Sequence, residues 1–118
     1  MLDKAHRITS AADYKHVVRR GRRSAGGSTV TYTTKNPNGG EPRFGFIVAK
    51  TVGNAVARNR VRRRLKALSY AALQGEFVPR KSLFGCDLVF RALPSSASAS
   101  FSDLRDDVER AVSLAASR

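Results

Sequence analysis

Six cationic side chains fall within nine consecutive positions, from Arg58 to Lys66. Guanidinium and ammonium groups at this density bind phosphate oxygens through charge-assisted hydrogen bonds. No Asp or Glu occurs between Glu41 and Glu76, so the run has no local acid to pair with. Like charges four residues apart on a helix cost roughly 0.2–0.5 kcal/mol per pair, and a polyanion would remove that cost. The run therefore predicts a phosphate-backbone site, with a solvated helix face as the alternative.

Side chains that could carry catalysis are scattered along the chain. Ser, His and Asp occur at no spacing that unites a nucleophile with a base, and no phosphate-binding glycine loop is present. His6 and His16 lack a partner at metal-ligand spacing and are expected on the surface. Asp103, Asp106 and Asp107 open a predicted helix, where capping and the helix dipole explain them better than a metal cluster. We therefore predict a binding protein with no catalytic and no metal-ligating residue.

The charge is distributed unevenly. The 118 residues carry a net charge of +13, which points to nucleic acid or another anionic partner. Residues 1–66 hold 16 Lys or Arg against 3 Asp or Glu, whereas residues 67–118 hold 6 of each. We expect the binding surface in the first two thirds of the chain.

Size and composition fit one domain with a modest core. No apolar run approaches the roughly 18 residues of a membrane span, so no membrane contact is expected. The start of the chain lacks the apolar stretch of a signal peptide, and a cytoplasmic location is the default expectation. The single cysteine, Cys86, stands in an apolar run and is predicted to be a small core residue.

The cationic run needs a helix to present it, and the pattern predicts one from Asn54 to about Leu73. Asn54 is a suitable N-cap, and Gly53 before it predicts a tight turn with unusual backbone angles. At about 100° per residue, five apolar side chains form one stripe, and most of the cations lie opposite it. The stripe consists of Ala57, Val61, Leu65, Leu68 and Ala72.

The preceding elements are a helix and two strands. Ser10 opens a predicted helix that ends near Arg20, with Asp13 placed as in a capping box. Alternating residues predict strands over 28–34 and 43–50, which we expect to pair as an antiparallel hairpin. The second strand is apolar or small on both sides, which is typical of a central strand.

The last third adds one strand and one helix. An apolar run predicts a strand over 85–92, and the serine-rich stretch 95–100 predicts a linker or loop tip. Ser100 and Asp103 form a capping-box pattern before a final helix with an apolar stripe. The fold class is α+β, with helices packed on a small sheet.

The eleven residues from Gly53 to Arg63 read Gly-Asn-Ala-Val-Ala-Arg-Asn-Arg-Val-Arg-Arg. They closely resemble the Arg-Asn-Arg signature of the bacterial ribonuclease P protein subunit family. The resemblance covers essentially the whole chain, and its other matches are Asp13-Tyr14 with Gly21, Tyr32, the segment 43–50 and the segment 102–112.

The resemblance implies a specific fold and role. The fold would be a single-domain α/β sandwich of order αβββαβα, similar to the second domain of ribosomal protein S5, with a left-handed βαβ crossover. Residues 1–118 would form one RNA-binding domain, with flexible ends at 1–9 and 114–118. The activity would be ribonuclease P, the endonucleolytic removal of the 5′ leader from precursor tRNA. Catalysis would be carried by an RNA subunit with Mg²⁺, held mainly by RNA and substrate.

The family pattern also implies site residues. Two aromatic positions of the cleft that receives the single-stranded leader match Tyr14 and Tyr32, although periodicity alone favours ordinary packing for both rings. Val18 stands where an aromatic residue is common, so stacking is expected to be weaker, and Thr51 stands where a second basic residue is common. Contacts to the RNA subunit are expected from Lys50, Asn54, Arg58, Asn59, Arg60, Arg62, Arg63 and Lys66.

The expected partners are the catalytic RNA and precursor tRNA, with no protein partner implied. A non-catalytic RNA-binding module, such as a ribosomal or assembly protein, would show the same charge and fold. Non-specific DNA compaction is a further alternative. Stimulated cleavage of precursor tRNA would separate the first two readings, and a preference for structured RNA would exclude the third.

Overall fold

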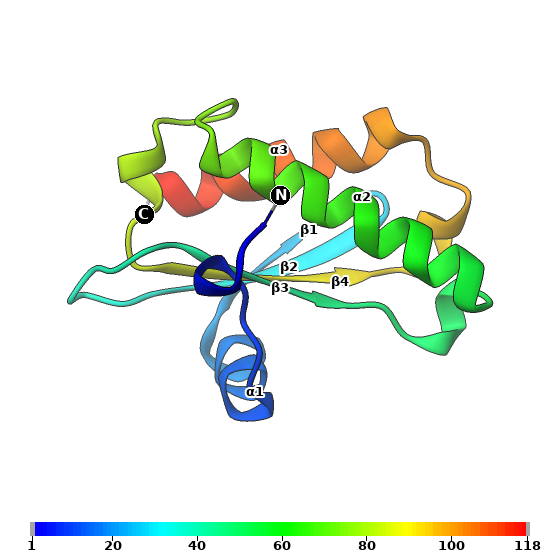
Figure 1. Ribbon diagram of the computed structural model, residues 1–118, viewed down its shortest axis with the longest axis horizontal. Helices are drawn as coiled ribbons and strands as arrows, with labels where there is room; N and C mark the ends of the chain where they lie inside the picture. The colour runs from blue at the N-terminus through cyan, green and yellow to red at the C-terminus, as the bar shows by residue number, and fades with distance from the viewer. Residues whose placement is uncertain (1, 118) are drawn as a thin grey trace.

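A four-stranded mixed sheet forms the middle of the molecule, with α1 on one face and α2 and α3 on the other (Figure 1). The computed structural model describes residues 2–117, so the ends of the predicted domain 1–118 lie outside the described residues. The order of elements confirms the predicted αβββαβα arrangement. The elements are α1 (Ala11–Arg20), β1 (Arg22–Ala25), β2 (Thr29–Lys35), β3 (Arg43–Ile47), α2 (Ala55–Leu73), β4 (Cys86–Ala92) and α3 (Phe101–Ala116).

The strands follow the spatial order β1-β2-β4-β3. β2 pairs antiparallel with β1 and with β4, whereas β3 runs parallel to β4. In Figure 1, β3 lies in front of β4, both point the same way, and α2 returns above them. This path makes the β3–α2–β4 connection left-handed, as predicted, although almost all such connections are right-handed.

The predicted antiparallel hairpin between 28–34 and 43–50 is wrong. β2 and β3 are not neighbours, because β4 lies between them. At one end of the sheet, Gly85 accepts a hydrogen bond from Asn36 and donates one to Gly40, each 2.7 Å long. The partner of β2 on its other side is β1, a short basic strand that the alternation of residues did not predict. Alternation defines the faces of a strand but carries no information about its neighbours.

The expectation of a central strand over 43–50 is also wrong, because β3 is an edge strand that ends at Ile47. Its two apolar faces have separate explanations. Phe44 is fully buried beneath α2 and α3, while Gly45 faces Tyr14 of α1. A Cβ atom at Gly45 would lie 2.6 Å from the Tyr14 ring, so only glycine admits this close approach.

Side-chain caps begin the three α-helices where the sequence predicts. Ser10, Asn54 and Ser100 each accept a hydrogen bond from the backbone N–H three residues later. Asp103 completes the capping box of α3. Gly53 has a φ of 153°, a conformation that residues with side chains rarely adopt, which confirms the tight turn before α2.

Two hydrophobic cores lie on opposite faces of the sheet. The larger core fills the space beneath α2 and α3, and it includes Cys86, as predicted. The smaller core, beneath α1, has only Ile8, Val17 and Val89 as fully covered members. The largest buried side chains of the larger core are Phe44, Phe90, Leu65, Leu68, Leu83, Leu88 and Leu104.

The N-terminal segment, residues 2–9, joins these cores around the open edge of β3. Leu2 is buried in the larger core, and Ile8 is buried in the smaller one. Between them, Arg7 forms a parallel bridge with Phe44, and the Ile8 N–H donates to the Phe44 carbonyl at 2.8 Å. Residues 2–9 are therefore packed and hydrogen-bonded along this edge.

Asp107 has a different role from the capping predicted for it. It lies in the second turn of α3 and is buried against the turn between β1 and β2. Its carboxylate accepts hydrogen bonds from Gly27 N at 3.1 Å, Ser28 N at 2.9 Å and Thr29 Oγ1 at 3.1 Å. The predicted loop over 95–100 is also ordered, since Ser96 is buried in a short 3₁₀ turn, Pro94–Ala97.

Candidate nucleic-acid interface

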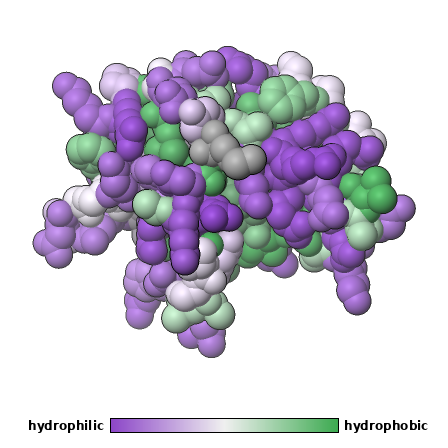
Figure 2. All heavy atoms as spheres, in the orientation of Figure 1, coloured by the Kyte–Doolittle hydropathy of each residue, from purple (hydrophilic) through white to green (hydrophobic). Residues whose placement is uncertain are grey.

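Helix α2 presents the cationic run because its apolar stripe is buried. Val61, Leu65, Leu68 and Ala72 are buried in the larger core, which turns the opposite side of the helix to solvent. Asn54 Oδ1 accepts from Ala57 N at 2.9 Å and fixes the first turn. Figure 2 shows hydrophilic side chains crowded over α2 on the face that carries the N-terminus. A phosphate backbone can approach this side of α2 directly.

Neighbouring segments orient several of the arginines. Arg60 and Arg64 donate to the carbonyl oxygens of Ala97 and Ala99, both at 3.2 Å, in the turn before α3. Sequence reasoning did not predict these bonds, because it could not show that residues 94–99 lie beside α2. These bonds restrict the side chains and leave other N–H groups of each guanidinium for an anion.

The predicted contacts to an RNA subunit all lie on α2 or on the turns that lead into it. Lys50, Asn54, Asn59 and Arg63 are exposed. Arg62 donates to Asn59 Oδ1 at 2.9 Å. Half-buried members of the set are Arg58, Arg60, Arg62 and Lys66.

The three residues predicted for the leader cleft lie together on the other face of the sheet. Tyr14, Val18 and Tyr32 are partly exposed and pack around the smaller core. The Tyr14 hydroxyl accepts from the Phe46 N–H at 3.0 Å, which fixes the ring over Gly45. Tyr32 stands opposite Val89 of the neighbouring strand. The structure thus offers two tyrosine rings between α1 and the sheet.

Arg43 attaches α1 to this face, and sequence reasoning did not find it. Its guanidinium makes a bidentate contact with Asp87, at 2.7 and 3.0 Å, and a further bond to Asp13 of α1 at 3.2 Å. The hydrogen bonds that Arg43 donates to Asp87, and then the one that it donates to Asp13, raise the pKa of Arg43 above its usual value. The sequence signal for this contact was Asp13, an acid in the first helix of an otherwise strongly basic segment.

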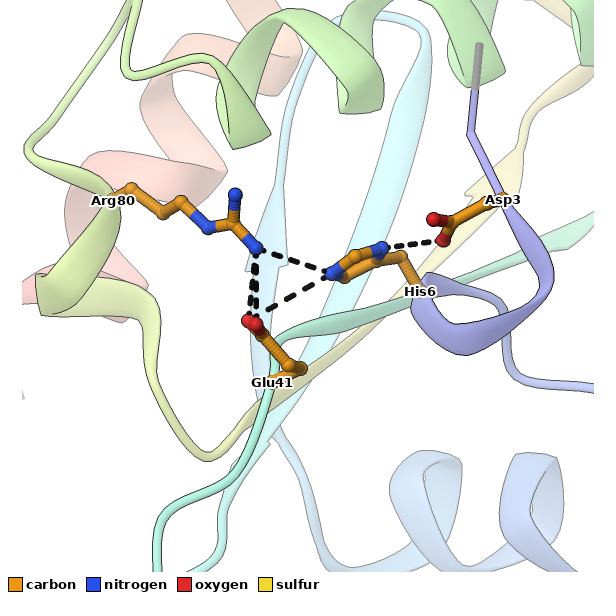
Figure 3. A network of polar contacts seen from close by, with 4 residues as sticks. All are labelled: Asp3, His6, Glu41 and Arg80. Atoms are coloured by element: carbon orange, nitrogen blue, oxygen red, sulfur yellow. Dashed lines mark hydrogen bonds and ion pairs between the residues drawn. The ribbon is translucent and has the colours of Figure 1, made fainter.

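A second polar network fixes the N-terminal segment (Figure 3). His6 contacts Asp3 through Nδ1 and Arg80 through Nε2, the latter at 3.3 Å. Arg80 also bonds both oxygens of Glu41, at 3.1 and 3.0 Å. The side chain of His6 is only 13% exposed, so its predicted surface position is wrong. The hydrogen bond from Arg80 is the main cause that lowers the pKa of Glu41.

A small hollow of about 170 Å³ connects the two predicted sets of residues. Tyr14 lines it from the α1 face, and Arg62 and Lys66 line it from α2. The residue between them is Arg7, which the sequence analysis did not assign to a site. The two sets are therefore continuous around the edge of β3.

Metal-binding and membrane-spanning features were also sought. Among residues 2–117, no three His, Cys, Asp or Glu side chains gather into a group that could hold a metal ion. No helix in the described part of the chain is long and apolar enough to cross a membrane.

Comparisons with known proteins agree with this geometry. The family model for ribonuclease P matches residues 2–116. The ribonuclease P protein component of Clavibacter michiganensis is 44% identical over 115 residues, covering 98% of this chain and 96% of that protein. Its counterpart in Pseudarthrobacter chlorophenolicus is 43% identical over 112 residues, covering 95% and 78%.

Solved structures share the fold. The RNase P protein from Staphylococcus aureus superposes with a TM-score of 0.77 at 24% identity, covering 95% of this chain and 96% of that chain. The RNase P protein from Thermotoga maritima gives a TM-score of 0.72 at 18% identity, covering 92% and 96%.

Proposed function

The chain belongs to the ribonuclease P protein family, and we propose that it acts as the non-catalytic protein subunit of a ribonuclease P holoenzyme. In this role it binds the catalytic RNA and the 5′ leader of precursor tRNA. Removal of the leader then produces the mature 5′ end of the tRNA. The observation that carries the proposal is the acid-free cationic side of α2, which continues around the β3 edge, through the 170 Å³ hollow beside Tyr14, to the face where Tyr14 and Tyr32 pack on the smaller core.

The cationic side of α2 is assigned to the RNA subunit. Cations grouped on one helix can contact several phosphates of a folded RNA, and their binding releases condensed counterions. The bonds from Arg60 and Arg64 to Ala97 and Ala99 pre-orient two of these groups, so less side-chain freedom is lost on binding.

The cleft beneath α1 is assigned to the single-stranded leader. Unpaired bases stack on aromatic rings, whereas paired bases present no free face. Tyr14 and Tyr32 supply two rings, and Val18 adds a smaller apolar surface on the same core. Stacking is independent of base identity, so the cleft would accept leaders of different sequence.

Following the family resemblance, we assign Mg²⁺ to the RNA and the substrate and no catalytic step to the protein. Its contribution is to hold the two RNAs together and to neutralise their phosphates.

A reconstitution assay tests the proposal. A bacterial ribonuclease P RNA is incubated with precursor tRNA at low millimolar Mg²⁺, with and without this chain. Cleavage that depends on the protein is the expected result. Tight binding to that RNA without stimulated cleavage would favour the alternative of a general RNA-binding module.

Two variants then separate the surfaces. Arg58→Ala should weaken RNA-subunit binding roughly tenfold, as expected for one charge-assisted hydrogen bond. Tyr32→Ala should weaken only substrates that carry a leader, and equal loss for mature tRNA would contradict the cleft assignment. Tyr32 is preferred to Tyr14 here, because the Tyr14 hydroxyl also holds the backbone of Phe46.

A further inference from the structure

A hollow lies where the N-terminal segment meets α2, and we call it the N-terminal hollow. Its volume is about 620 Å³, within the range of pockets that hold small organic ligands. Two segments build it, residues 2–9 and the second half of α2. The lining residues are Leu2, Arg7, Arg63, Lys66, Ala67 and Tyr70.

The lining combines two kinds of chemistry. Leu2, Ala67 and the ring of Tyr70 form an apolar wall, and Tyr70 keeps 38% of its surface exposed. The other three lining residues are cations, and no acid is among them. A ligand that matches both parts has a flat, weakly polar group beside a negative charge. A nucleotide has this composition, with an aromatic base next to a phosphate.

Arg7 gives an independent reason to expect a ligand. Its Nε atom is buried and has no hydrogen-bond partner. Within residues 2–117, no hydrogen bond or ion pair joins its guanidinium to another side chain. The backbone bridge to Phe44 holds Arg7 in place, and its side chain lines both the N-terminal hollow and the 170 Å³ hollow beside Tyr14. A guanidinium fixed in this way is ready for an external acceptor.

The bases of a regular RNA duplex are paired and stacked, so a duplex would place only phosphates on this surface. An apolar wall would then face a charged backbone and gain nothing from it. A base that is unpaired in the folded RNA can instead leave the stack and lie against an aromatic ring. The hollow is lined by Arg63 and Lys66, which the proposed function assigns to the RNA subunit, and it shares Arg7 and Lys66 with the 170 Å³ hollow beside Tyr14.

We propose that the N-terminal hollow binds one unpaired nucleotide of the catalytic RNA. The base lies against Tyr70, and the adjoining phosphate contacts Arg7 and Arg63. This inference rests on the proposed function for the identity of the partner. It adds a site of its own, with Tyr70 as a stacking residue and Arg7 as a phosphate ligand.

Affinity measurements with full-length protein and a bacterial ribonuclease P RNA test the two contacts separately. Tyr70→Ala should weaken binding about tenfold, and Tyr70→Phe should not, because stacking requires the ring and not the hydroxyl. The slope of log affinity against log salt should stay unchanged in Tyr70→Ala. Phe101→Ala removes an aromatic ring that is 44% exposed on α3 and is the matched control.

Arg7→Ala should lower the salt slope by roughly 0.7–0.9, the value for one lost phosphate contact. Arg110→Ala, an exposed cation on α3, is the control and should leave the slope unchanged. Circular dichroism and thermal melting of each variant show that the fold is retained. If wild-type protein binds and stimulates the RNA while Tyr70→Ala and Arg7→Ala match it, the hollow is not a nucleotide site. Failure of the wild-type protein itself would overturn the proposed function instead.

Crosslinking gives a second readout that does not depend on a loss of affinity. A photoreactive phenylalanine analogue at position 70 should crosslink to a nucleotide that is unpaired in the RNA subunit. The same analogue at position 101 should give no crosslink. Crosslinks from position 70 that map to base-paired nucleotides would overturn the proposal, and so would tight binding without any crosslink.

Discussion

The two faces of the sheet differ in how completely they are covered. On the α2–α3 face, two helices of 19 and 16 residues cover a core that includes Phe44, Phe90 and Leu65 at 0% exposure. On the other face, α1 has 10 residues and packs its own Val17 into the core with Val89, and two tyrosine rings remain partly exposed. Most of the buried apolar core therefore lies on the first face, whereas the second leaves apolar surface partly exposed.

The two faces also differ in how far their hydrogen-bonded polar side chains are exposed to solvent. On the α2–α3 face a buried carboxylate, Asp107, is satisfied by three protein donors. On the α1 face the Arg43 network is partly exposed, with 35% of the Arg43 side chain open to solvent. A helix held by solvent-screened contacts over a thin core can adjust its position at lower cost than one in a close-packed core.

The largest effect is expected at Asp107. Asp107→Ala should lower the free energy of unfolding by about 3 kcal/mol, since it leaves two backbone donors and one hydroxyl without their acceptor. Urea denaturation measures the change. Asp106→Ala removes the same charge from an exposed neighbouring position, and a similar loss there would show that the effect is one of helix charge alone.

A matched valine pair compares the two cores directly. Val108→Ala in α3 should lower the free energy of unfolding by about 2–3 kcal/mol, because the close-packed side chains around Val108 cannot move to fill the cavity that is left. Val17→Ala in α1 should lower the free energy of unfolding by only about 1 kcal/mol, because a helix that lies over a small core can move to fill the cavity. Both side chains are at 0% exposure, so equal losses in denaturation would contradict the proposed difference.

The Arg43 network should affect the α1 face alone. Arg43→Ala should lower the free energy of unfolding by about 1–2 kcal/mol, reduced by the partial solvent exposure of all three groups. Affinity for leader-bearing substrate should fall while affinity for the RNA subunit stays within twofold. Arg43→Lys keeps the charge but loses the bidentate geometry, and full recovery by it would show that charge alone positions α1.

The smallest effect is expected at the N-terminal segment, which links the two faces. The lowered pKa of Glu41 means that its pairing with Arg80 stabilises the fold above the ordinary glutamate pKa of about 4.3. That stabilisation is lost as the pH falls through the lower pKa of the folded state. The melting temperature of wild-type protein should exceed that of Glu41→Gln at pH 7, and the gap should close in acid. A difference in melting temperature that does not change with pH would show that it arises from packing and not from the charge of Glu41.

Much of the secondary structure followed from short-range pattern. The caps Ser10, Asn54 and Ser100 bond a residue only three positions away, so local sequence specifies them. The buried stripe of α2 follows from helical periodicity in the same way. Strand neighbours did not follow, since β4 separates β2 from β3 although it comes last of the strands in the chain. The family resemblance implied a third strand before the cationic helix and the left-handed crossover. Alternation of residues predicted neither.

The sequence by itself determined the cationic helix, its caps and the location of the charge, because each depends on residue type and near spacing. The candidate RNA-binding residues came from the family resemblance. Tertiary structure alone decided which distant groups meet. Arg43 reaches Asp13 across 30 positions, Arg80 reaches His6 across 74, and Ser28 reaches Asp107 across 79. Such contacts depend on how the helices pack on the sheet, and no local periodicity encodes them. The N-terminal hollow belongs to this second group, since it exists only where residues 2–9 lie against α2.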